Sequence, residues 1–377
     1  MTGAGPGYNT AVIRQFPFII ALAGLGSAAA TVRSTPPAAS EARALVDTKR
    51  QEIYIDLAPV DLPARTHHHM IAQPPVAILR LPVSGAIYGF RVIMIDSAGH
   101  QITSALIHHF NLIDPDHREL FLPISRRMAA AGHETGAMTI PWFFFGFPIN
   151  QGERVLASAM LENLTDTSYV QARIRLVLEY TPAGRPWPLY KAEPFQMDVA
   201  FPVGDKSFDL PPGRFSKSYE GSPAVPGTIV GIGGHVHAYA DSLEFVDATT
   251  GSVIYRTRPI TNAAGDIEGV PVARLYRWNR LGTHIEPAHR YRVTVYYTNP
   301  TGESIPDGGM GVVGGLFVPD RGVTWPATNP ADTLYQQDYR HAARLIPESE
   351  HGMDMHMTTD HHMHSMPDHG AAHPSAP

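Results

Sequence analysis

The fold of this chain is decided by the stretch from Val170 to Pro188, which reads VQARIRLVLEYTPAGRPWP. Its first part, Val170–Tyr180, has the length of a strand and is rich in β-branched and aromatic residues. Its second part, Thr181–Pro188, holds three prolines and a glycine. Because proline removes the donors that a strand ladder needs, we expect a linker between two β domains here.

Strand-length apolar runs separated by turn residues continue on both sides of this linker. Before it, strands are predicted over Gln51–Ala58, Val76–Leu81, Ile87–Ile95, Ile102–Phe110, Thr139–Phe145 and Arg154–Leu161. After it, they are predicted over Phe195–Val203, Thr228–Tyr239, Ser242–Val246, Val253–Arg258, Val270–Trp278, Tyr291–Tyr297 and Val312–Val318. Ser125–Ala131 carries a weak helical pattern. The pattern predicts an all-β fold of two tandem antiparallel β-sandwich domains, over 50–182 and 183–320, followed by a loop-like extension over 321–350.

Composition narrows the classes of function. The chain has 377 residues, of which 44% are hydrophobic and 17% charged, and its net charge is −6. A negative balance argues against a nucleic-acid footprint. The absence of cysteine excludes disulfides, Cys-ligated zinc and thiol catalysis. The 20 His and 13 Met, many of them clustered, set the chain apart from an average enzyme.

The N-terminus has the order of a secretory signal peptide over residues 1–30. Arg14 precedes the apolar run Phe16–Leu25, and small residues ending at Ala30 follow. The run is short for a bilayer span, although an ordinary apolar segment or an uncleaved anchor is the alternative. Residues 31–49 are interpreted as a linker. We expect a periplasmic or secreted protein without a stable membrane span after cleavage.

The motif Gly233-Gly234-His235-Val236-His237 is the first that carries chemistry. Residues i and i+2 of a strand face the same side, so the two imidazoles converge about 7 Å apart and suit one metal ion. The preceding glycines leave room for a close backbone approach. Two half-buried core histidines are the alternative interpretation.

Three further groups are candidate ligands. Met310 lies in a glycine-rich turn, and its thioether is a soft ligand that suits copper(I). His108 and His109 are adjacent, so both can reach one ion only at a strand end or a bulge. The loop cluster consists of His67, His68 and His69. Glu134, beside His133, is interpreted as surface charge. The hydrolase, zincin and P-loop motifs are absent.

The order of these motifs resembles the copper type II, ascorbate-dependent monooxygenases, the family of peptidylglycine α-hydroxylating monooxygenase and dopamine β-monooxygenase. The resemblance covers roughly residues 50–320 and is strongest at GGHVHAYADSLEFVDATTG and HRYRVTVYYTNPTGESIPDGGMGVVGGLF. It implies two jelly-roll-like sandwiches with one copper each. It also implies that His235, His237 and Met310 bind the oxygen-activating copper, and that His108 and His109 bind the electron-transfer copper.

The chain departs from the family in four places. The family's third electron-transfer ligand is a histidine, whereas the matching strand here offers Met160, with His133 or the 67–69 cluster as alternatives. The family's disulfides cannot form. The arginine that anchors the substrate before H-x-H is replaced by Ile232-Gly233-Gly234, so a peptide substrate is not supported. The Tyr and Asn that follow the family's Met are Gly and Leu here.

The C-terminal tail, 351–377, is the last candidate site. Its sequence from His351 to His373 holds seven His and five Met without an apolar period. Mixed imidazole and thioether donors serve both copper(II) and copper(I), so we expect this tail to bind further copper ions. The predicted ligands there are His351, Met353, Met355, His356, His361, His362 and His364.

Two functions follow from these observations. One is a two-copper monooxygenase that uses O2 and ascorbate, or another reductant, to hydroxylate a small substrate, with the tail loading copper. The other is a carrier, buffer or resistance protein for periplasmic copper, which the missing third histidine favours. A structural β-sandwich protein with a metal-binding tail is a third interpretation.

Overall fold

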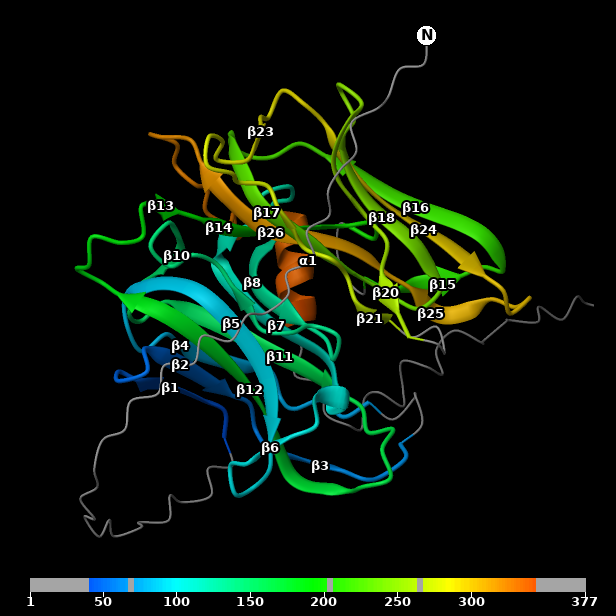
Figure 1. Ribbon diagram of the computed structural model, residues 1–377. Helices are drawn as coiled ribbons and strands as arrows, with labels where there is room; N and C mark the ends of the chain where they lie inside the picture. Colours follow the sequence, from blue (N-terminus) through cyan, green and yellow to red (C-terminus); the bar gives the residue numbers. More distant parts are fainter. Residues whose placement is uncertain (1–40, 67–70, 202–205, 263–266, 344–377) are drawn as a thin grey trace, which may run out of the picture. The chain divides into compact units, whose positions relative to one another are not determined.

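The computed structural model describes residues 41–66, 71–201, 206–262 and 267–343. Figure 1 shows that these residues form two neighbouring groups of antiparallel sheets, which confirms the prediction of an all-β chain with two tandem sandwiches. The expected signal peptide, the 67–69 cluster and the His/Met tail lie outside the described residues.

The first sandwich combines a sheet ordered β1-β2-β12-β5-β10-β13 with a sheet ordered β4-β11-β7-β8. The pairings within them are antiparallel except for β10 with β13. The elements are β1 Arg43–Asp47, β2 Glu52–Asp56, β3 Val60–Leu62, β4 Ala77–Arg80, β5 Gly85–Ile95, β6 Gln101–Ile102, η1 Ser104–Leu106, β7 Ile107–Arg118, β8 Ser125–Ala131, β9 Met138–Thr139, β10 Phe145–Ile149, β11 Arg154–Leu161, β12 Tyr169–Pro182 and β13 Tyr190–Lys191.

The second sandwich combines sheets ordered β14-β26-β17-β22 and β16-β24-β18-β19, with small two-stranded additions. Its elements are β14 Glu193–Asp198, β15 Phe208–Leu210, β16 Gly213–Gly221, β17 Gly227–Val236, β18 Ala240–Asp247, β19 Ser252–Thr257, β20 Ile260–Thr261, β21 Ile267–Gly269, β22 Ala273–Arg274, β23 Thr283–Ile285, β24 Tyr291–Asn299, β25 Ile305–Gly309 and β26 Gly311–Pro319. A helix, α1, follows over Thr333–Ala342.

The two sandwiches repeat one topology. The order β2-β12-β5 matches β14-β26-β17, and β4-β11-β7-β8 matches β16-β24-β18-β19. A buried asparagine makes the same bonds in each copy. The amide of Asn163 donates to the carbonyls of Leu62 and Pro63, and that of Asn299 donates to those of Leu210 and Pro211. The sequence analysis did not detect this duplication.

Each sandwich has its own core of alternating inward side chains. The first core gathers buried residues such as Ile55, Leu112 and Ile174, and the second gathers Phe245, Tyr291 and Phe317. Burying a large apolar side chain contributes roughly 1.5–3 kcal/mol. The turn between β7 and β8, residues 120–124, packs into the second core, so the two sandwiches share apolar surface.

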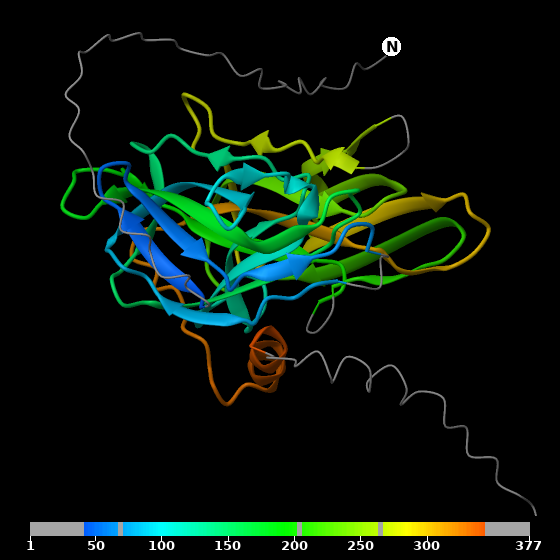
Figure 2. The same cartoon turned by 90° about the horizontal axis from the view of Figure 1, so that it is seen from below.

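Buried ion pairs join the sandwiches on one side. Arg126 of β8 contacts Asp114 of β7 and Glu193 of β14. Arg127 contacts Asp338 of α1, and both side chains are nearly inaccessible to solvent. Figure 2 shows α1 lying outside the layers of strands, where it packs on β8. Among the described residues no helix is long and apolar enough to cross a bilayer.

Several local predictions were wrong. The predicted strand Ile102–Phe110 is interrupted by η1, and within the predicted strand Val270–Trp278 only Ala273–Arg274 form a strand, β22. Ser125–Ala131 is the strand β8, because pairing with β7 overrides its weak helical pattern. The predicted strand Thr139–Phe145 is broken by a turn after Pro141. The predicted linker 31–49 contains β1, which pairs with β2, and the extension expected to be loop-like contains α1.

Candidate metal centre

Among the residues that the structure describes, one group of three potential ligands lies close enough to share a metal ion. It consists of His109, His235 and His237, whose ligand atoms all lie within 4.8 Å of one another. The ring centroid of His109 is 5.3 Å from that of His235 and 6.1 Å from that of His237. Imidazole nitrogens bind zinc or similar ions at about 2.0 Å, so small side-chain rotations close these three around one ion.

The strand β17 and its end supply two of these histidines. His235 lies in β17 and His237 directly follows its last residue, with ring centroids 5.4 Å apart. The same-face geometry of i and i+2 therefore brings the two rings together, as predicted. Gly234 permits this packing, because a Cβ there would collide with the Leu243 side chain and the Val312 carbonyl.

The third histidine comes from the other sandwich. His109 lies near the start of β7, the central strand of a sheet in the first sandwich. The resemblance implied that His109 belongs to a separate copper site with His108. In the structure it instead faces the H-x-H pair of the second sandwich. The centre thus lies at the junction of the two sandwiches.

Hydrogen bonds orient two of the rings for metal binding. The Nδ1 of His235 lies 2.7 Å from Oε1 of Glu134, and the Nδ1 of His237 lies 3.3 Å from the carbonyl oxygen of Asp307. When Nδ1–H donates to such an oxygen, the lone pair of Nε2 is free for a metal. The Nε2 of His235 is buried and has no hydrogen-bond partner. Buried polar atoms normally have a partner, so this nitrogen is a candidate metal ligand.

Glu134, interpreted from the sequence as surface charge, is instead a buried side chain that contacts the candidate centre. It follows β8 in the first sandwich, so its bond to His235 crosses the junction between the sandwiches. Burial acts to raise its pKa, but the hydrogen bond with His235 outweighs burial and the pKa is lowered to about 2. An ionised carboxylate only accepts hydrogen bonds, so His235 donates through Nδ1. Because Glu134 and His235 are 101 positions apart in the chain, no local pattern in the sequence predicts their contact.

The electrostatics of the site favour neutral imidazoles. Burial, followed by the charges of neighbouring histidines, lowers the pKa of His237 to about 4 and that of His109 well below its ordinary value. Burial also lowers the pKa of His108. A metal binds the neutral imidazole, so these rings are ready for a metal at neutral pH without losing a proton first.

The two predicted methionine ligands flank the centre. Met160 lies directly opposite His109 in the ladder between β11 and β7 and is partly exposed. Met310 directly precedes Gly311, which pairs with Val236, so it lies beside His237. The hydroxyl of Tyr297 accepts hydrogen bonds from the backbone N–H groups of His237, at 3.2 Å, and Met310, at 2.9 Å. Tyr297 therefore holds the two ligand segments together.

The remaining predicted ligands of the first sandwich lie at the edge of the centre. The ring of His108 is 4.4 Å from that of His109, and its Nδ1 lies 4.0 Å from Oε2 of Glu162. His133 is half-exposed, and its Nδ1 lies 3.7 Å from Oε2 of Glu134. Neither belongs to the group of three.

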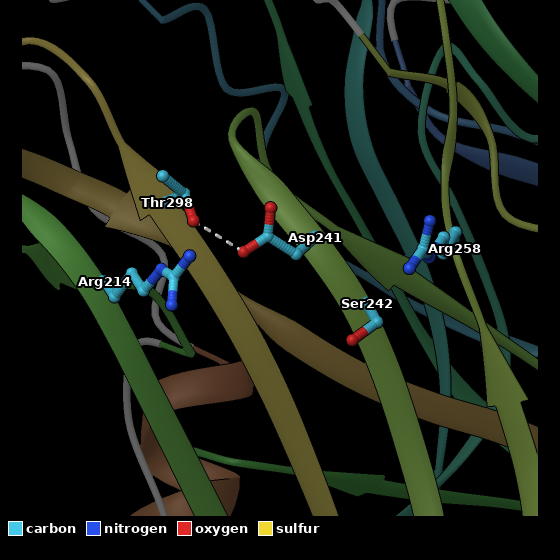
Figure 3. Close-up of a pocket in the computed structure, with 5 residues that line it drawn as sticks. All are labelled: Arg214, Asp241, Ser242, Arg258 and Thr298. Carbon is cyan, nitrogen blue, oxygen red and sulfur yellow. Dashed lines mark hydrogen bonds between the residues drawn. The ribbon is translucent and has the colours of Figure 1, made fainter.

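A separate shallow depression occurs on the second sandwich. It has a volume of about 390 Å³ and is lined by Arg214, Asp241, Ser242, Arg258 and Thr298 (Figure 3). Within it the hydroxyl of Thr298 donates to Asp241 at 2.7 Å. None of the three clustered histidines lines it, and four of its five lining residues are exposed to solvent.

The chain matches no protein-family profile and no curated protein. Among solved structures, PNGF-II is 9% identical over 74% of this chain and 66% of its own, with a TM-score of 0.30. N-glycanase F (PNGase F) is 10% identical over 74% and 99%, with a TM-score of 0.31. The PBSX exported protein XepA is 10% identical over 70% and 86%, with a TM-score of 0.16. Likenesses of this size assign neither a family nor an activity.

Proposed function

We propose that this chain is an exported copper-binding protein that holds a copper ion between His109, His235 and His237. The observation that carries the proposal is the convergence of three ligand nitrogens within 4.8 Å from the two sandwiches. A buried imidazole nitrogen without a partner is costly, and an ion would satisfy the one on His235.

The neighbouring side chains favour copper over zinc. Met160 pairs with His109 between neighbouring strands, and Met310 lies beside His237 along the backbone. Thioethers suit copper(I), whereas zinc takes Cys, His and carboxylate ligands. Imidazoles serve copper in both oxidation states. The His/Met composition of the tail repeats this mixed donor set. The site therefore suits a protein that carries, buffers or senses copper in the periplasm.

A second candidate, the monooxygenase, has one observation in its favour. Three protein ligands leave a coordination position open for an outside molecule, and the histidines of the centre are only partly buried. Copper bound there would supply one-electron chemistry with dioxygen. His108, with its ring next to His109, is then the residue available to a second ion.

Copper titration tests the first proposal. The described unit ends at Ala343 and is compact without the tail, so both the full chain and a chain ending at Ala343 are titrated against a competing chelator. We expect the shorter chain to retain one tight site. His235→Ala and His237→Ala should each weaken that site by more than about 100-fold, since even indirect partners of metal ligands contribute 10–100-fold.

The matched control is His100→Ala, because His100 is a strongly exposed histidine outside the cluster. Equal copper binding by H235A, H237A and H100A in the shorter chain would refute the centre. Ascorbate-dependent oxygen uptake by the copper-loaded chain, lost in H237A but not in H100A, would favour the monooxygenase over the carrier.

A further inference from the structure

Three loops of the structure expose aromatic side chains that are usually buried. The chain has four tryptophans, and three of them lie on these loops. Trp142 is 47% exposed, Trp187 is 39% exposed and Trp278 is fully exposed. Phe143, Leu189 and Tyr190 accompany them, each more than a third exposed. Large apolar patches on a soluble surface mark interaction sites.

Packing holds the three loops next to one another. The rings of Trp142 and Trp187 have centroids 6.3 Å apart, and the N–H of Leu189 donates to the carbonyl of Phe143 at 3.1 Å. The third loop is a turn closed by the bridge between Arg277 and Arg280. Tyr276, at the base of this turn, contacts Phe145 next to the first loop, with ring centroids 5.0 Å apart. We call Trp142, Phe143, Trp187, Leu189, Tyr190 and Trp278 the aromatic loop patch.

The loops are basic, although the chain is acidic overall. Segments 136–150, 183–192 and 270–285 contain no Asp or Glu, whereas the whole chain has 35 acidic and 29 basic residues. Their five basic side chains are all exposed, namely Arg185, Lys191, Arg274, Arg277 and Arg280. A partner of this surface is therefore expected to be anionic.

We propose that the aromatic loop patch docks the protein peripherally on an anionic lipid surface. Tryptophan and tyrosine prefer the boundary between headgroups and acyl chains, where the ring is apolar and its N–H or O–H stays wet. Arginine and lysine next to them bind anionic headgroups. This proposal does not depend on the proposed copper centre, because none of the copper ligands belongs to the aromatic loop patch.

Two other occupants fit the patch less well. A sugar chain stacks on flat rows of rings beside hydrogen-bonding acceptors, but the ring planes of Trp142 make angles of 83° with Phe143 and 89° with Trp187. These loops also lack carboxylates. A second copy of the chain would bring the same five positive charges face to face, and like charges repel.

Vesicle sedimentation tests the proposal with the full chain in EDTA, at about pH 8, where the tail histidines are neutral. Vesicles consist of phosphatidylcholine alone or with phosphatidylglycerol. We expect sedimentation only with phosphatidylglycerol, weakened by salt, and a blue shift of tryptophan fluorescence. The double variant Trp142→Ser/Trp187→Ser should reduce partitioning about tenfold or more, because two large apolar side chains are lost. Arg185→Ala/Arg277→Ala should also reduce it.

The matched controls are Val170→Ser and Arg214→Ala, which alter an exposed apolar and an exposed basic residue outside the loops. Copper affinity should be unchanged in all variants, which separates this test from that of the metal centre. For wild type, quenching of tryptophan fluorescence by brominated lipid gives a readout that needs no variant. Absence of vesicle binding, equal binding to phosphatidylcholine alone, or unaltered binding by W142S/W187S overturns the proposal. A solution dimer or polysaccharide binding abolished by W142S/W187S, without vesicle binding, overturns it in favour of the other occupants.

Discussion

At the scale of single residues, Glu134 orients His235, one of the proposed metal ligands. Its carboxylate lies on the first sandwich and accepts from the Nδ1 of His235 on the second. This bond selects the tautomer whose Nε2 lone pair faces His109 and His237. Carboxylates in this position raise the basicity of the ligand and hold the ring in place.

Replacing Glu134 should therefore weaken the metal site without removing a ligand. For Glu134→Gln we expect copper affinity to fall by about 10–100-fold, because the neutral amide no longer holds the Nδ1–H donor as firmly. Competitive titration of the chain ending at Ala343 measures this loss. Glu153→Gln, which changes a loop carboxylate of the first sandwich outside the centre, is the control. Unchanged affinity in E134Q would remove Glu134 from the site.

The buried histidines also predict how stability depends on pH. Burial lowers the pKa of His237 to about 4 and lowers those of His108 and His109. In the unfolded chain they titrate near 6.5, so the unfolded state binds more protons between about pH 4 and 6.5. This contribution to stability is complete above about pH 6.5 and is lost as the pH falls through the folded values.

Urea denaturation of the metal-free chain ending at Ala343 measures this dependence. The free energy of unfolding should rise between about pH 4 and 6.5 in the wild type, and the slope should be smaller in His237→Ala. An identical slope in both proteins would contradict the assigned protonation states.

At the scale of elements, each of two matching strands, β11 and β24, ends near a buried asparagine that makes the same set of hydrogen bonds. Asn163 follows β11 and Asn299 ends β24, which occupy equivalent positions in their sheets. Each amide donates to three backbone carbonyls, and each Oδ1 accepts from a threonine two residues later. Both asparagines are buried, so no solvent could replace these bonds.

Because the two asparagines make equivalent hydrogen bonds, replacing either one should lower the free energy of unfolding by a similar amount. We expect Asn163→Ala and Asn299→Ala each to lower the free energy of unfolding by about 2–4 kcal/mol, since several buried carbonyls lose their donor. Urea denaturation measures both, and Thr250→Ala, at an exposed turn, is the control. A loss of stability in only one of the two variants would show that the two asparagines are not equivalent.

At the scale of the whole molecule, the metal centre depends on how the sandwiches are joined. His109 belongs to one and His235 and His237 to the other, so any change in their mutual placement separates the ligands. The ion pair between Arg127 and Asp338 fixes α1 to the first sandwich, and the chain reaches α1 from the second. The C-terminal segment thus ties the two halves together.

Removing the ion pair between Arg127 and Asp338 should lower both the free energy of unfolding and the copper affinity. Asp338→Ala leaves the buried guanidinium of Arg127 without its partner, so we expect a loss of about 3–5 kcal/mol. Copper affinity should fall with it, although Asp338 is no ligand. Arg340→Ala, on the exposed face of the same helix, is the control. Full copper affinity in a folded D338A protein would show that α1 does not position the centre.

The sequence by itself determined the all-β class and most strands. Alternation and turn residues are local signals, and Arg154–Leu161 was predicted at the bounds of β11. The pairing of His235 with His237 was equally local, since it follows from the period of two in a strand. Where local signals were weak, as at Ser125–Ala131, pairing with a distant strand prevailed.

Which residues make up the proposed metal centre depends on tertiary packing and could not be predicted from local patterns. His109 and His235 are far apart in the chain, and the turn of residues 120–124, buried in the second core, helps to bring them together. The partnership of Glu134 with His235 arises in the same way. Contacts between sandwiches depend on how two finished surfaces pack, and no periodicity along the chain encodes that packing.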